Sequence, residues 1–195
     1  MNQKQIAQSK LARLRQQLLA ARETDYSYPS CVAAIDQLLG QLDEVAVHVK
    51  SLEKRQPDMQ VALLRSVNIE CINVTKLLGM IVRSTSTRTA FEFYSPFLGV
   101  CKTALGQDSK LIMSSEWEYS PLTIVQDLPY LPDFLFIGLP ASESDNALIF
   151  PASGHELGHQ IWFKEKNREK FALQVEDLVI EAMEISRVEI EKTYS

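Results

Sequence analysis

Apolar side chains recur at helical spacing through the first part of the chain. Residues 1–22 carry apolar positions three or four apart, separated by Gln, Lys and Arg, which predicts an amphipathic helix. Pro29 interrupts this pattern, and Ser30 is placed to cap a second helix. A third helix begins near Pro57; it is more apolar than the others, and we expect it to be more buried. Residues 1–84 should therefore form a helical hairpin or a three-helix bundle.

The pattern changes at a short run of Ser and Thr, residues 84–87, which is the best candidate for a domain boundary. A short helix is predicted beyond it over residues 98–105. Short apolar runs at residues 110–113 and 133–138 predict two strands, separated by a loop that contains three prolines. A long final helix is predicted over about residues 167–193.

The start of the helix between the second strand and the final helix has two interpretations. In the first, Ser142 or Ser144 caps it. In the second, residues 146–150 form an edge strand and Pro151 opens the helix as its first residue. Both interpretations make residues 155–162 helical.

The strongest chemical signal is the run from His155 to His159, which reads His-Glu-Leu-Gly-His. Two histidines four apart on a helix are offset by about 40° and one turn, so both imidazoles can bind one metal ion. Glu156 lies about 100° further round, beside the ion, where a general base can take a proton from metal-bound water. The motif holds two of the three histidines of the chain, and we expect the third, His48, on the surface of the second helix.

A glycine inside this motif is unusual for a helix. Gly158 costs about 1 kcal/mol relative to Ala at a helix interior position. We expect a packing reason, such as the close approach of another backbone, to explain it.

The His155–His159 run resembles the signature of the zincin metallopeptidases, and the likeness is confined to residues 149–162. It implies a Zn2+ ion bound by His155 and His159, Glu156 as the catalytic base, and a mixed fold in which the active-site helix lies beside a small sheet. The run is also similar, together with residues 139–148, to longer uncharacterised bacterial proteins with a Gly-His-Glu-Leu-Gly-His helix. That similarity implies that relatives continue beyond residue 195.

The third zinc ligand stays open at this point. The metzincin branch uses a histidine shortly after the second one, at the position that Glu165 occupies here, so this branch is disfavoured. The gluzincin branch uses a glutamate of a following helix, and Glu181 comes slightly later than the usual spacing, with Glu189 as the second choice. Either the chain has an unusually spaced third ligand or none, or it is the front portion of a longer enzyme.

The final helix has a stripe of apolar residues that we expect to be buried. Phe171, Val175 and Leu178 belong to it, Glu181 lies on its flank, and Glu189 lies within it.

The charge, the apolar runs and the cysteines of the chain indicate which partners and which cellular compartment to expect. The net charge is -5 and the basic residues are scattered, which argues against nucleic-acid binding. No secretory signal is visible, and no apolar run approaches the roughly 20 residues that a membrane helix needs. The chain has three widely spaced cysteines, and this pattern predicts neither a set of disulfides nor a metal site built from paired cysteines. We therefore expect a soluble, cytoplasmic protein.

These observations predict a mainly α (α+β) fold with two regions, a helical bundle at residues 1–84 and a zincin-like metal-binding region at residues 85–195 whose C-terminus can be incomplete. The first functional hypothesis is a zinc metallopeptidase that hydrolyses peptide or other amide bonds of a peptide or protein substrate. The alternative is a helical interaction or regulatory protein with a degenerate or truncated zincin centre. In that case the N-terminal helices would bind a protein partner.

Overall fold

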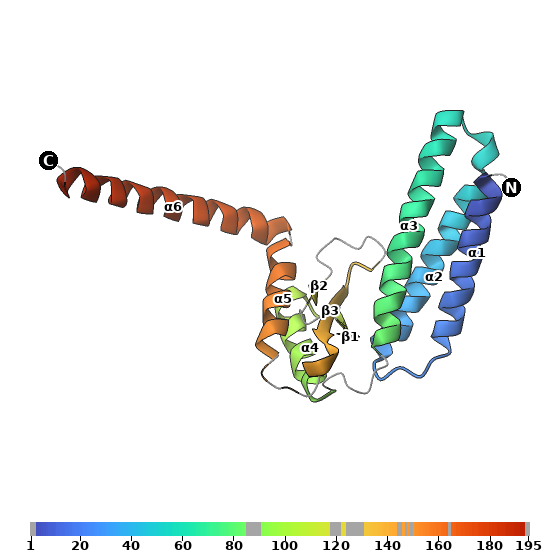
Figure 1. Cartoon of the computed structure of the whole chain (residues 1–195), viewed down its shortest axis with the longest axis horizontal. Helices are drawn as coiled ribbons and strands as arrows, with labels where there is room; N and C mark the ends of the chain where they lie inside the picture. The colour runs from blue at the N-terminus through green and yellow to red at the C-terminus, as the bar shows by residue number, and fades with distance from the viewer. Residues whose placement is uncertain are drawn as a thin grey trace.

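The computed structural model describes residues 3–84, 91–117, 122–123, 131–143, 146, 148, 150–163 and 165–193. The described residues form six α-helices and a three-stranded sheet, which confirms the mainly α (α+β) class (Figure 1). The helices are α1 (Gln3–Arg22), α2 (Pro29–Lys50), α3 (Pro57–Arg83), α4 (Phe91–Leu105), α5 (Phe150–Phe163) and α6 (Glu165–Thr193). The strands are β1 (Lys110–Glu116), β2 (Leu122–Thr123) and β3 (Phe134–Pro140). Short 3-10 helices lie at Leu52–Lys54 and Ala141–Glu143.

Helices α1, α2 and α3 lie side by side as the predicted three-helix bundle (Figure 1). Leu11, Leu14 and Leu18, spaced by one turn, supply the buried side of α1. The expectation that α3 is the most buried helix is wrong at its outer face, where Val61 and Ile72 are more than half exposed. The buried residues of α3 gather in its second half, where the helix also contacts the sheet.

The cap predicted at Ser30 is also wrong. Helix α2 begins one residue earlier, at Pro29, and no side chain caps it. Proline is preorganised for the first helical position because its φ is fixed and its missing N–H needs no partner there. The hydroxyl of Ser30 instead donates to the carbonyl oxygen of Leu111 at 2.7 Å and lies 3.2 Å from the hydroxyl of Tyr94. It thereby ties α2 to β1 and α4.

The sheet has the strand order β1-β3-β2, with β1 parallel and β2 antiparallel to the central β3. Strands β1 and β3 confirm the two predicted strands, and both extend beyond the predicted runs. Strand β2 was not predicted, because two residues are too few to show an alternating pattern. Alternate residues of the buried strands face opposite ways, so the sheet is covered on both sides. Ile112 and Phe136 pack on the helical bundle, whereas Met113 and Ile137 pack with α4 and α5.

The core of the bundle thus continues onto one face of the sheet. A single cluster of buried residues includes Leu38 of α2, Ile81 of α3 and Phe136 of β3. Helix α3 ends at Arg83, at the predicted boundary, and residues 85–90 lie outside the described residues. The division into regions 1–84 and 85–195 stays a prediction.

A partly buried ion pair fixes the end of α3 to the sheet. Arg83 donates from two nitrogens to the carboxylate of Glu116 on β1, at 3.1 and 3.0 Å, and the hydroxyl of Ser114 donates to the same oxygen at 2.6 Å. The Glu116 side chain crosses directly over Gly138 of β3. A Cβ atom at Gly138 would lie 2.6 Å from Cγ of Glu116 and 2.9 Å from Cγ of Leu122.

Replacing Gly138 by Ala should therefore lower the free energy of unfolding by about 1–3 kcal/mol, because the clash displaces a carboxylate that three hydrogen bonds hold in place. Chemical denaturation measures this. Gly99→Ala in α4 is the matched control, because a Cβ there meets nothing within 4 Å and Ala favours the helix. Equal losses of stability in the two variants would contradict the tight packing at Gly138.

Helix α6 leads away from the rest of the molecule (Figure 1). The apolar stripe that was expected to be buried is exposed: Phe171, Val175 and Leu178 all face solvent. Phe171 stacks on Trp162 of α5, with ring centroids 6.2 Å apart, but the described side chains beyond this contact are uncovered. Periodicity along a helix carries no information on whether a neighbour covers its apolar face.

None of the described helices combines the length and the apolar character that crossing a membrane requires. The three cysteines are free thiols: Cys31 and Cys101 are buried and Cys71 is partly buried. Burial raises the pKa of the Cys101 thiol to about 12.

Candidate metal centre

Helix α5 carries the His-Glu-Leu-Gly-His run. It begins at Phe150 with Pro151 in its first turn, close to the second of the two predicted starts. The edge strand of that interpretation is not found: Asn146 and Leu148, its described members apart from Phe150, lie outside the sheet. Instead, the side-chain oxygen of Asn146 accepts from the backbone N–H of Leu148 at 3.0 Å. Ser142 lies in the 3-10 helix before this turn, and Ser144 is outside the described residues.

The faces of α5 differ in their surroundings. Ser153, Glu156 and Leu157, at positions i, i+3 and i+4, are buried against the rest of the fold. The Oγ atom of Ser153 has no hydrogen-bond partner among the described residues. His155 and His159 share the neighbouring face and are exposed. The packing of the inner face therefore holds the two imidazoles at the surface of a fixed helix.

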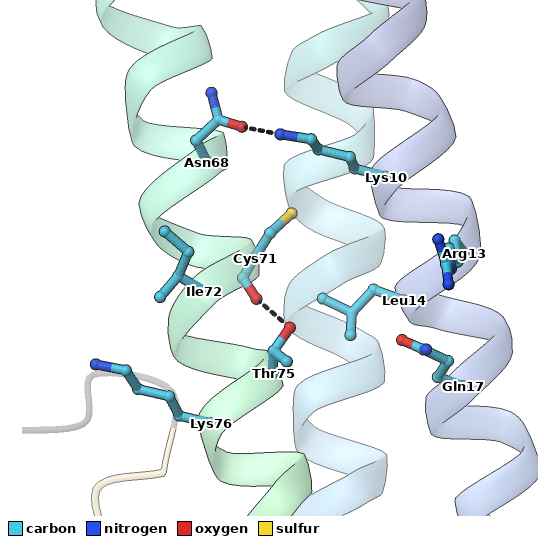
Figure 2. A pocket seen from close by; sticks show the side chains of 9 residues that line it. All are labelled: Lys10, Arg13, Leu14, Gln17, Asn68, Cys71, Ile72, Thr75 and Lys76. Atoms are coloured by element: carbon cyan, nitrogen blue, oxygen red, sulfur yellow. Dashed lines mark hydrogen bonds between the residues drawn. The ribbon is translucent and has the colours of Figure 1, made fainter.

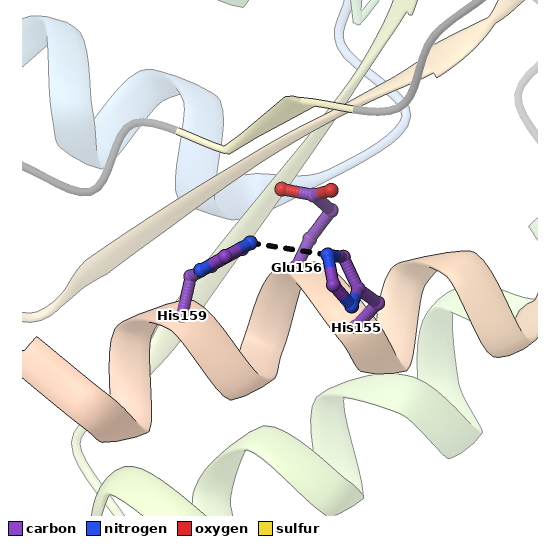
Figure 3. A group of neighbouring side chains, drawn as sticks. All are labelled: His155, Glu156 and His159. Atoms are coloured by element: carbon purple, nitrogen blue, oxygen red, sulfur yellow. Dashed lines mark hydrogen bonds between the residues drawn. The ribbon is translucent and has the colours of Figure 1, made fainter.

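The imidazoles converge as the sequence predicts. Figure 3 shows both rings rising from one side of α5, and their Nε2 atoms lie 3.1 Å apart. The ring planes meet at 84° with centroids 4.7 Å apart. Two nitrogens that bind one tetrahedral zinc at about 2.0–2.1 Å are separated by about 3.3 Å. The observed spacing fits a shared metal ion with a small adjustment of the side chains.

Glu156 stands beside this pair. Its carboxylate rises between the imidazoles and the strands that pass over α5 (Figure 3), and the residue is only 8% exposed. One ligand atom from each of His155, Glu156 and His159 lies within 4.8 Å of the other two. A space of this size accommodates a metal ion with a water molecule between the ion and the carboxylate.

A hydrogen bond links α5 to the edge of the sheet. The side-chain amide of Gln160 donates to the hydroxyl of Thr123 on β2 at 3.0 Å, and that hydroxyl donates to the carbonyl oxygen of Phe136 at 2.9 Å. This relay fixes the distance between the two histidines and the edge strand. The sequence signal could not reveal it, because Thr123 stands 37 residues from Gln160.

The reason expected for Gly158 is wrong. A Cβ atom there meets nothing within 4 Å, and the same holds for Gly154. No close backbone among the described residues explains these glycines; they leave the surface of α5 next to His155 and His159 open instead.

The candidate third ligands lie away from this group. Glu181 is exposed on α6, about 24 Å along the helix from its first residue, and Glu189 is about 36 Å along it. Because α6 leads away from α5, the structure does not bring either residue to the histidines (Figure 1). Within the described part of the chain, His155, Glu156 and His159 form the one group that could hold a metal ion. His48 is exposed on α2, as expected.

No family model, no curated protein and no solved structure matches this chain. The likeness to the zincin signature therefore stays a prediction that rests on the motif. The described residues establish a helix-borne group of two histidines and one glutamate that can hold a metal ion beside the edge of a small sheet.

Proposed function

We propose that this protein is a zinc-dependent metallopeptidase, which hydrolyses peptide or other amide bonds through an activated water molecule. The 3.1 Å separation of the two Nε2 atoms, with the buried Glu156 carboxylate beside them, is the observation that carries this proposal. Two imidazoles favour zinc over magnesium or calcium, which prefer oxygen ligands.

The residues of α5 have two proposed roles, metal binding and proton transfer. His155 and His159 would hold the ion through their Nε2 atoms. Bound zinc would lower the pKa of its water molecule towards about 7 and polarise the substrate carbonyl. Glu156 would accept the proton of that water at a carboxylate oxygen and pass it to the departing amine. Its burial supports this role, because a side chain that is only 8% exposed has few alternative orientations.

In the proposed centre, the two histidines are the protein ligands of the zinc ion. Glu181 is the first candidate for a third ligand and Glu189 the second, but α6 would have to change its direction to bring either one to the ion. We therefore expect zinc to bind more weakly here than at a site with three protein ligands. Glu181→Gln should leave the zinc content unchanged.

Removal of the metal tests the proposal. A chelator should reduce the hydrolysis of a mixed fluorogenic peptide library to background, and one equivalent of Zn2+ should restore it, because the water is activated only on the ion. Magnesium is the matched control and should restore nothing. Full activity in the presence of the chelator would contradict the proposal.

A second candidate function is that of a helical interaction protein, and the exposed apolar length of α6 favours it. In this case a folded protein would bind a partner through its helices and hydrolyse no peptide. The two candidates differ in whether activity follows the zinc content.

A further inference from the structure

Helix α6 exposes large apolar side chains along much of its length. Every described side chain from residue 169 to residue 183 is exposed. Six large apolar residues of this segment are at least half exposed: Leu173, Val175, Leu178, Val179, Ile180 and Met183. Helices in water take most of their stability from packing one apolar face against a neighbour. A surface of this kind indicates a binding partner for α6.

The charges of α6 describe that partner. Residues 171–183 contain three acidic side chains and no basic one. At about 100° per residue, Glu176 and Glu181 lie on opposite flanks of the face formed by Val175, Leu178 and Val179. No ion pair among the described residues involves Glu176, Asp177 or Glu181. The partner should therefore offer an apolar groove with a positive charge on each rim.

The molecule has such a groove on its helical bundle. A cavity of about 400 Å³ lies between α1 and α3, with Leu14 and Ile72 among its apolar lining (Figure 2). Lys10 and Arg13 line it from α1, and Lys76 lines it from α3. No acidic side chain lines it among the described residues.

Lys10, Arg13 and Lys76 have no acidic partner among the described residues. Helix α1 has five basic residues and no acidic residue. Three of its five cations pair with acidic residues of α2 and the following 3-10 helix: Lys4 with Glu53, Arg15 with Asp43, and Arg22 with Asp36. Lys10 donates to the amide oxygen of Asn68 at 2.9 Å, and neither Arg13 nor Lys76 forms an ion pair among the described residues. The unneutralised charge of α1 is therefore concentrated at the groove.

We propose that α6 of a second copy of this chain occupies the groove between α1 and α3 and completes a four-helix bundle. Acidic flanks would meet cationic rims, and the apolar face would cover Ile72, which is 55% exposed. The lengths agree, since α6 has 29 residues and α3 has 27. A second copy is required because α6 leads away from the bundle of its own chain (Figure 1).

Exchange of α6 between two copies makes the contact reciprocal. A twofold dimer of this kind buries both apolar helices and both grooves, and therefore doubles the contact area of a single docking event. The exchange involves none of His155, Glu156 and His159, the group that could hold a metal ion, but it would keep Glu181 of α6 away from them.

Charge reversal with light scattering tests the exchange. The wild-type protein should be a dimer. The acid variant Glu176→Lys/Glu181→Lys and the groove variant Arg13→Glu/Lys76→Glu should each raise the dimer dissociation constant at least about tenfold, because like charges then face each other in both contacts. Lys54→Glu is the matched control: it reverses an exposed lysine outside the groove and should leave the dimer intact.

The decisive experiment mixes the two variants. Each α6 then meets a groove of opposite charge, so the mixture should form a heterodimer more tightly than either variant dimerises alone. Circular dichroism confirms that both variants remain folded. A monomeric wild-type protein would overturn the proposal. In that case α6 folds back on its own chain, or another molecule occupies the groove. A dimer that the acid variant breaks and the groove variant does not would also overturn it, because α6 would then pair elsewhere.

Discussion

Replacing Glu156 by Gln is expected to lower the kcat of peptide hydrolysis by about 10²–10⁴-fold while leaving zinc bound. Glutamine keeps the shape of the side chain and its buried position but cannot accept a proton from metal-bound water. General-base catalysis contributes about 10²–10⁴-fold to the rates of such reactions, so kcat should fall by that factor. The measurement is the initial rate on a fluorogenic peptide, with the zinc content of the same sample determined by mass spectrometry.

Glu169→Gln provides the matched control for this variant. Glu169 is exposed on α6, so the same chemical change there should leave both kcat and zinc content as they are. Two outcomes would contradict the assignment of Glu156. Unchanged kcat would remove it as the base, and loss of zinc would make it a metal ligand.

The second large effect is expected at the histidines. His155→Ala and His159→Ala should each weaken zinc binding by more than about 100-fold, because loss of an outer hydrogen-bond partner alone costs about 10–100-fold. Each variant removes one of the two protein ligands that the described residues supply. Competition with a zinc-binding dye measures the affinity, and hydrolysis should fall with it.

His48→Ala is the matched control, because His48 is an exposed histidine on α2. Its zinc affinity should equal that of the wild-type protein. Equal affinity in His155→Ala as well would show that zinc binds elsewhere on the chain.

Local patterns predicted the helices of this protein, because a helix is a repeat of local contacts. The spacing of Leu11, Leu14 and Leu18 was enough to identify α1 and its buried side. The errors arose where a second element decides the outcome. Leu178 and the third helix, which contains Val61, were expected to be buried, but no described neighbour buries Leu178 or Val61. Ser30 was expected to cap α2, but its hydroxyl bonds to Leu111, which is 81 residues away.

The same distinction holds at the candidate site. His155 and His159 could be paired from sequence because their convergence depends only on helix geometry. The relay from Gln160 to β2 could not, because it needs a strand of two residues that no pattern reveals. The third ligand is a long-range question of the same kind, and spacing alone placed Glu181 nearer to the histidines than the structure does.

The reciprocal dimer and a third zinc ligand from α6 require different positions of this helix. An α6 that occupies the groove of a second copy cannot also turn back to bring Glu181 to the histidines. The charge-reversal variant Glu176→Lys/Glu181→Lys should therefore lose the dimer and keep its zinc. Loss of zinc in that variant would indicate that Glu181 is a zinc ligand, and it would contradict the two-histidine arrangement.

X-ray absorption spectroscopy at the zinc edge tests the central claim most directly, on protein loaded with one equivalent of Zn2+. The central claim is that His155 and His159 hold one zinc ion together. We predict scattering from two imidazole groups with Zn–N distances of about 2.0–2.1 Å, and from one imidazole or none in His159→Ala. A zinc ion surrounded only by oxygen in the wild-type protein would contradict the claim.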